Sequence, residues 1–180
     1  MNILITILLV IVALVALLLI LGLFTKKECN IIREISINKS KQQVFDYIKL
    51  LKNQDYYNKW VMTDPDMKKE FRGTDGTAGF VYAWNGNKQA GEGEQEITKV
   101  KEGELVDSEV RFVRPFKSVA HATFTTSAIS DSQTLVKWHI TSGMNYPMNV
   151  MLLFMNMDKM MGRDMETSLG NLKKLLEANG

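Results

Sequence analysis

Residues 118–144 read SVAHATFTTSAISDSQTLVKWHITSGM and contain two runs in which apolar and polar side chains alternate. Phe124 and Trp138 belong to the apolar positions of the two runs, and Ser130-Asp131 lies between the runs. A period of two is typical of a β-strand with one buried face. Two such runs on either side of a short turn predict an antiparallel hairpin.

The period of two continues toward the N-terminus of this hairpin. Glu102-Gly103 and Asn85-Gly86-Asn87 separate the earlier runs, and Asn-Gly readily supplies the positive φ angles of a tight hairpin turn. We therefore expect a meander of six antiparallel strands. Its four earlier members are Met67–Arg72, Gly79–Asn85, Glu92–Lys101 and Leu105–Val113.

Helical patterns flank the meander. After a strand at Cys29–Ile37, Ser40 and Gln43 have the spacing of a capping box that begins a helix. A second short helix is expected at Asp55–Trp60. Beyond Pro147, one long C-terminal helix is predicted from apolar residues at helical spacing. They are Val150, Leu153, Phe154, Met157, Met160, Met161, Met165, Leu169, Leu172 and Leu176. The predicted class is α+β, a curved antiparallel sheet wrapped around the C-terminal helix, because that arrangement buries both apolar faces.

This order of elements resembles the helix-grip fold of the START-like, or SRPBCC, superfamily, and within it the polyketide-cyclase-like branch. The resemblance extends over Ile31–Leu176. The matching stretches are Ile31–Ile37 with Val44 and Phe45, Trp60, Met62–Met67, Gly79–Trp84, Asn85–Asn87, Gly91–Gly93, Met144–Asn149 and Gly162–Leu175. The resemblance implies an internal apolar cavity that binds lipids, sterols, polyketides or other hydrophobic molecules. Some members are cyclases or hydrolases and others activate chaperones, so the fold leaves the function open.

Strand parity indicates which side chains would line a cavity between the sheet and the long helix. The candidate ligand-binding residues are Phe80, Tyr82, Trp84, Phe112, Phe124, Trp138, Tyr146, Met151 and Met155. Methionine is flexible and polarizable and recurs at surfaces that accept varied partners. The loop Met144–Asn149 is the expected gate. The alternative is that all these residues fill an ordinary core without a void.

The chain begins with an uncharged apolar run, Ile3–Phe24, which reads ILITILLVIVALVALLLILGLF. At about 1.5 Å per residue, a helix of this length crosses a hydrocarbon core of roughly 30 Å. A cleaved signal peptide is the alternative, but no Lys or Arg precedes the run and no small-residue cleavage site follows it. We expect residues 1–25 to be a single-pass membrane anchor and residues 26–180 to be one SRPBCC/START-like domain. Lys26 and Lys27, together with the single cysteine, Cys29, favour a cytoplasmic domain.

Charge and motif spacing argue against several functions. The net charge is +2 with no concentrated basic stripe, so no nucleic-acid partner is expected. His121 and His139 share parity with polar positions and lack a third ligand, so we expect no metal site. No cofactor is predicted, and Cys29 has no catalytic partner nearby in sequence.

Three carboxylates are the best candidates for catalysis. Glu92, Glu94 and Glu96 share one face of a strand. A carboxylate desolvated by aromatic neighbours would have a raised pKa and could act as a general acid. Burying three together would be very costly, so we favour the orientation in which all three point outward and Gln95 and Ile97 point inward.

The sequence is compatible with three functions. The leading hypothesis is a membrane-anchored protein that binds a hydrophobic small molecule or lipid near the bilayer, where the anchor raises its effective concentration. The second is a polyketide cyclase- or hydrolase-like enzyme that uses Glu94, Glu96 or Tyr82, although no catalytic residue is assigned. The third is a non-catalytic protein-interaction module, which an exposed apolar patch would support.

Overall fold

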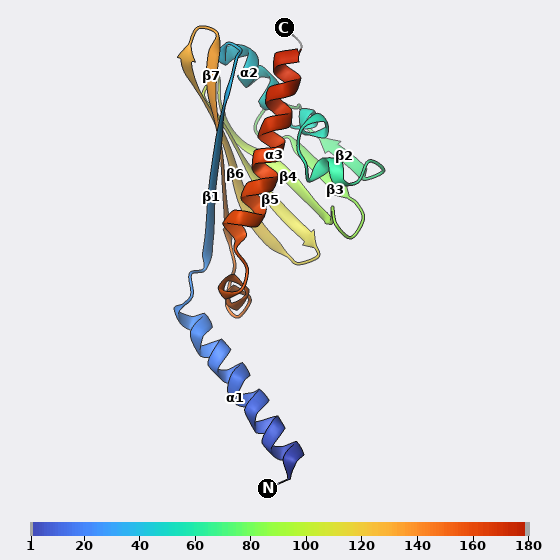
Figure 1. Ribbon diagram of the computed structural model, residues 1–180. Coiled ribbons are helices and arrows are strands. Elements are labelled where there is room, and N and C mark those ends of the chain that lie inside the picture. Colours follow the sequence, from blue (N-terminus) through green and yellow to red (C-terminus); the bar gives the residue numbers. More distant parts are fainter. Residues whose placement is uncertain (1, 179–180) are drawn as a thin grey trace.

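The computed structural model describes residues 2–178 and contains one seven-stranded antiparallel sheet. The strands follow the order β1-β7-β6-β5-β4-β3-β2, so the last strand of the meander pairs with the first strand of the chain (Figure 1). Their bounds are β1 Glu28–Ile37, β2 Lys68–Arg72, β3 Val81–Asn85, β4 Glu92–Lys101, β5 Leu105–Arg114, β6 Ser118–Ser130 and β7 Gln133–Gly143. The predicted helix-grip architecture is confirmed.

The helices lie on one side of the sheet and at its end. The long helix α3 runs along the curved sheet and packs against β1, whereas α1 projects away from the domain (Figure 1). The α-helices are α1 Ile3–Phe24, α2 Lys41–Ile48 and α3 Met157–Ala178, and the 3₁₀ helices are η1 Leu51–Tyr56, η2 Val61–Thr63 and η3 Met148–Leu153. The predicted capping box of α2 is present, because Ser40 Oγ accepts from the Gln43 N–H and the Gln43 side chain accepts from the Ser40 N–H.

The core consists of two apolar clusters. In the larger cluster, Met165, Leu169 and Leu172 of α3 are fully buried against the middle of the sheet. The smaller cluster lies beneath α2 and η1 and contains Phe45 and Ile97, both fully buried. Burial of one such side chain stabilises the fold by about 1.5–3 kcal/mol, so these contacts hold α3 against the sheet.

The predicted C-terminal helix was too long at its N-terminal end. Residues 148–153 form the separate η3, and α3 begins only at Met157. The side-chain oxygen of Asn156 accepts a hydrogen bond of 2.9 Å from the backbone N–H of Lys159, as an N-cap residue does. Met151 and Met155 therefore precede the long helix instead of belonging to it.

Two local predictions between β1 and β4 were also wrong. The tight turn at Asn85-Gly86-Asn87 is replaced by a wider loop, in which the Asn87 side chain accepts from the N–H groups of Gln89 and Ala90. The positive φ falls on Gly91, at +70°, where a Cβ would meet the carbonyl oxygen of Arg114. The short helix expected at Asp55–Trp60 is replaced by η1, which ends at Tyr56, and by η2.

Candidate functional site

Two of the predicted ligand-binding residues pack within the larger cluster. The rings of Phe124 and Trp138 stack with their centroids 4.8 Å apart, and Trp60 meets the Trp138 ring edge-on at 5.5 Å. Phe112 is half-buried against the same cluster. Trp60 belongs to the loop between η1 and η2. The alternation along the strands carries no information about a loop residue, so the sequence did not predict that Trp60 packs here. These rings pack in the same apolar cluster as Met165, Leu169 and Leu172 of α3.

Three other predicted residues belong to the smaller cluster. Phe80 and Tyr82 are buried, and Trp84 is half-buried with its ring 5.9 Å from that of Phe112. The Tyr82 hydroxyl donates a hydrogen bond of 2.7 Å to Asp55, and Asp55 also pairs with Lys69. Burial and, next, the hydrogen bond to Asp55 raise the pKa of Tyr82. Tyr82 therefore keeps its proton at physiological pH.

The three carboxylates of β4 form ion pairs on the outer face of the sheet: Glu94 and Glu96 share Arg111, and Glu92 pairs with Arg114. Arg111 donates to Glu94 and Glu96 at 2.9 and 2.6 Å, and Arg72 also donates to Glu94 at 2.6 Å. The hydrogen bond from Arg72 and then the one from Arg111 lower the pKa of Glu94. A carboxylate with a lowered pKa is ionised at neutral pH and has no proton to donate. Glu94 is therefore unsuited to act as a general acid in a cavity. On the opposite face, Ile97 is fully buried, as expected.

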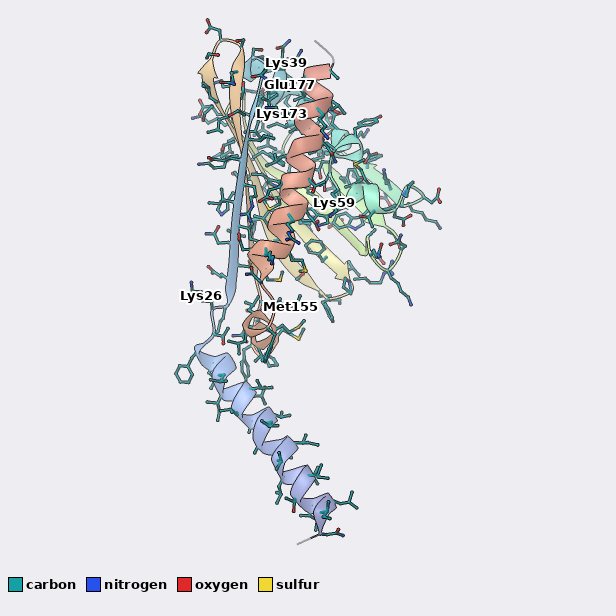
Figure 2. All side chains as sticks on the ribbon, in the orientation of Figure 1. Lys26, Lys39, Lys59, Met155, Lys173 and Glu177 are labelled. Atoms are coloured by element: carbon teal, nitrogen blue, oxygen red, sulfur yellow. The ribbon has the colours of Figure 1, made fainter. Side chains whose placement is uncertain are left out.

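A hollow of about 550 Å³ lies where α1 meets the domain. One wall is the segment from η3 to the start of α3, and the other is the start of β1. Its lining comprises Thr25, Lys26, Glu28, Cys29, Leu152, Leu153, Phe154, Met155, Asn156 and Met157. Met155 is the one predicted ligand-binding residue in this lining, and Figure 2 shows it at the same end of the domain as Lys26. We call this space the junction hollow.

A second, cationic hollow of about 400 Å³ adjoins the first, because Asn156 lines both. Its lining is Lys59, Asn156, Lys159, Met160, Arg163 and Asp164. Asp164 pairs with Lys59 and accepts a hydrogen bond of 3.0 Å from the Trp60 indole. Within residues 2–178, Lys159 and Arg163 form no ion pair, and Asp164, which lines the same hollow, is paired with Lys59.

The two remaining predicted residues lie near the end of α1. Tyr146 is exposed and borders Gly22, and Met151 is half-buried in η3. The side-chain nitrogen of Asn149 donates to the carbonyl oxygen of Gly22 at 2.6 Å. A Cβ on Gly22 would lie 2.5 Å from the Val150 side chain, so only glycine permits this approach. The only sign of this contact in the sequence was Gly22, a single glycine near the end of an aliphatic run. The sequence-based prediction did not include a contact at this position.

Arg33 fastens the beginning of α3 to β1. Its guanidinium group donates to Glu166 at 2.6 Å and to Asp158 at 3.0 Å. The group lies against the backbone of Gly162, where a Cβ would collide with it. At the other end of α3, Lys173 donates to the carbonyl oxygen of Ser36 at 2.8 Å (Figure 2). These contacts set the position of α3 and thereby the wall of the junction hollow.

Metal-binding geometry is not found in the described part of the chain. Residues 2–178 contain no group of three His, Cys, Asp or Glu side chains that could hold a metal ion. His139 instead lies 2.6 Å from the side-chain oxygen of Asn30. Cys29 is half-buried in the junction hollow, and burial, with a smaller effect of Asp158, raises the pKa of its thiol. A raised pKa lowers the fraction of reactive thiolate.

Comparison with protein-family models and with curated protein sequences finds no match. Solved structures do match. Norcoclaurine synthase from Thalictrum flavum, in complex with dopamine and hydroxybenzaldehyde, has a TM-score of 0.64 at 11% identity over 88% of this chain and 91% of that one. A protein from Nitrosospira multiformis has a TM-score of 0.59 at 14% identity over 84% and 100%. Ara h 8.0201 has a TM-score of 0.57 at 11% identity over 84% and 99%. At such identities the likeness shows the fold alone, which is the helix-grip fold.

Proposed function

We propose that this chain is a membrane-anchored helix-grip protein that binds a hydrophobic small molecule or lipid, and that the junction hollow is its binding site. The observation that carries the proposal is the position of this hollow. It opens beside the end of an apolar helix, and Leu152, Phe154 and Met157 are among its lining. Ligand sites of this kind are mostly apolar with a few polar groups.

The anchor is supported by the surroundings of α1. No residue of the 18-residue apolar window of α1 is buried against the domain, whereas Gly22 in the last turn is buried. Its last turn contacts η3 through Gly22, which is the arrangement expected of a helix that stays attached to the domain. A cleaved signal peptide would leave Asn149 without this partner. Resistance of the full chain to extraction from membranes by alkaline carbonate tests the anchor.

The orientation of the anchor is part of the same proposal. Lys26 and Lys27 follow α1 directly, and lysines at the end of a span favour the cytoplasmic side. Trypsin added to sealed inverted vesicles should then cleave the domain, whereas trypsin outside spheroplasts should leave it intact. The opposite pattern would reject the cytoplasmic placement without affecting the ligand site.

Ligand binding is tested with the full chain in mild detergent by native mass spectrometry. Wild-type protein should retain an apolar molecule or bind a pyrene-labelled fatty acid saturably. Leu152→Glu, which puts a charge into the lining, should lose the ligand, and a thermal melt checks that this variant still folds. Ile129→Glu is the matched control, because Ile129 is exposed on β6 outside the lining. A wild-type protein with neither retained nor saturable ligand would reject the proposal.

A further inference from the structure

An exposed apolar patch covers the end of the domain next to α1. We define the patch as Tyr146, Met148, Leu153, Phe154 and Met155, all of which are exposed. Phe154 is 72% exposed and Leu153 is 46% exposed, although both are large apolar side chains. Contiguous exposed apolar side chains mark a surface that contacts a protein or a membrane.

The contact with α1 fixes the level of this patch along the membrane-spanning helix. Asn149 and Val150, which lie between the patch residues in sequence, touch Gly22. Gly22 precedes the last residue of α1, Phe24, by two positions, which is about 3 Å along a helix axis. The patch therefore lies at the level where the apolar helix ends, and a bilayer that held α1 would have its interface at that level.

The charges around the patch fit the same surface. Lys26 and Lys27 follow α1, and Lys159 and Arg163 on the first turns of α3 form no ion pair within residues 2–178. Basic side chains close to a membrane with anionic lipids are attracted to its surface. Tyrosine is enriched at the headgroup level, which suits Tyr146. Apolar residues bordered by cations match a lipid surface better than they match a neutral protein groove.

We propose that the patch inserts into the interface of the same membrane leaflet that receives the end of α1. This inference rests on the proposed anchor and adds a second membrane contact to it. Leu153, Phe154 and Met155 belong both to the patch and to the lining of the junction hollow. Insertion of the patch makes the hollow open into the lipid interface, so an apolar ligand moves between leaflet and hollow without crossing water.

The test measures the depth of labels on the full chain in vesicles of phosphatidylcholine and phosphatidylserine. Cys29 is the single cysteine, so Cys29→Ser gives a cysteine-free background. An NBD fluorophore is then attached at Phe154→Cys, at Val12→Cys inside α1, or at Ile129→Cys. Ile129 lies near the β6–β7 turn, at the end of the sheet opposite α1 (Figure 1). Brominated lipids quench labels in the bilayer, and iodide quenches labels in water.

Quenching by brominated lipid is expected at positions 12 and 154, with blue-shifted emission at both, and iodide should quench position 129 alone. A label at 154 that behaves like the one at 129 overturns the inference, while quenching at 12 still supports the anchor. A label at 154 shielded from both quenchers also overturns it, because protein then covers the patch. If position 12 escapes brominated lipid, the anchor itself fails.

Discussion

The side-chain amide of Asn149 donates a hydrogen bond to the carbonyl oxygen of Gly22 and thereby joins the domain to the last turn of the apolar helix. The last carbonyl groups of any helix lack partners within the helix. Asn149 also reaches the carbonyl oxygen of Thr25, at 3.3 Å, and is itself fully buried. The junction between α1 and the domain is therefore a packed contact with a fixed geometry, and the junction hollow lies beside it.

Lys26 and Lys27 in the connection between α1 and β1 are already exposed, and loss of this contact should make that connection more mobile. Asn149→Leu removes one of the two donors to the Gly22 carbonyl oxygen and leaves only the Thr25 N–H, which costs about 0.5–1.5 kcal/mol, and Gly22→Leu forces η3 away. We expect tryptic cleavage at Lys26 and Lys27 to become at least several-fold faster in both variants, as followed by mass spectrometry. Gly170→Ala is the control, because a Cβ there meets no neighbour. Unchanged cleavage would mean that the contact does not hold the junction.

Because Arg33 packs against Gly162, the effect of Gly162→Ala on the free energy of unfolding should change sign when Arg33 is replaced. Gly162→Ala displaces the guanidinium group from Asp158 and Glu166 and should lower the free energy of unfolding in an otherwise wild-type chain. In an Arg33→Met background the collision is absent. Alanine should then stabilise α3 by up to about 1 kcal/mol relative to glycine. Denaturant unfolding of the four proteins measures both signs, and equal effects in the two backgrounds would contradict the packing described here.

Tyr57 has a buried hydroxyl group that forms no hydrogen bond within residues 2–178. Burial raises the pKa of this hydroxyl, so it stays protonated. Because an unsatisfied buried hydroxyl is costly, Tyr57→Phe should raise the free energy of unfolding by about 1 kcal/mol. Tyr56→Phe, at an exposed position, should change nothing. A lower stability of Tyr57→Phe would instead indicate that a polar group in the interior bonds this hydroxyl.

Glu94 should stabilise the protein in a way that depends on pH. Its arginine partners lower its pKa in the folded state, so its contribution is present above the unfolded pKa of about 4.3 and is lost as pH falls through the folded value. The midpoint of thermal unfolding of Glu94→Gln should lie below that of wild type at pH 6–8. The gap should correspond to about 1 kcal/mol or less and should close in acid. The control is Asp131→Asn, which removes a carboxylate in the β6–β7 turn, outside this ion-pair network.

The thiol of Cys29 should report on the junction hollow. Its raised pKa predicts slow alkylation by iodoacetamide near neutral pH and a rate profile displaced to higher pH than that of a free peptide thiol. A bound apolar molecule should slow the reaction further, since Cys29 lines the hollow. The control is a Ser127→Cys variant in a Cys29→Ser background, because residue 127 is exposed on β6. Equal rates at the two positions would contradict the burial of Cys29.

Local patterns predicted most of the fold because they depend on neighbours in sequence. Alternation defined the strands from β4 to β7, and the spacing of Ser40 and Gln43 defined the start of α2. The errors occurred where a distant residue decides the local conformation. The loop after β3 is held by Asp64, which accepts a hydrogen bond from the backbone of Asn87. The break before α3 accompanies the contact of η3 with Gly22, and helical spacing alone cannot distinguish a 3₁₀ turn from an α-helix.

The amino-acid sequence by itself determined which faces are apolar: one helix apolar on every side, a sheet with one buried face and an amphipathic C-terminal helix. Such periodicities are properties of consecutive residues, so no folded chain is needed to recognise them. Only the tertiary structure decided where space remains between those faces. Trp60, from the loop between η1 and η2, packs edge-on against Trp138, whereas a hollow lies beside η3 at the end of α1. Free volume depends on how side chains far apart in sequence meet, and no pattern along the chain contains that information.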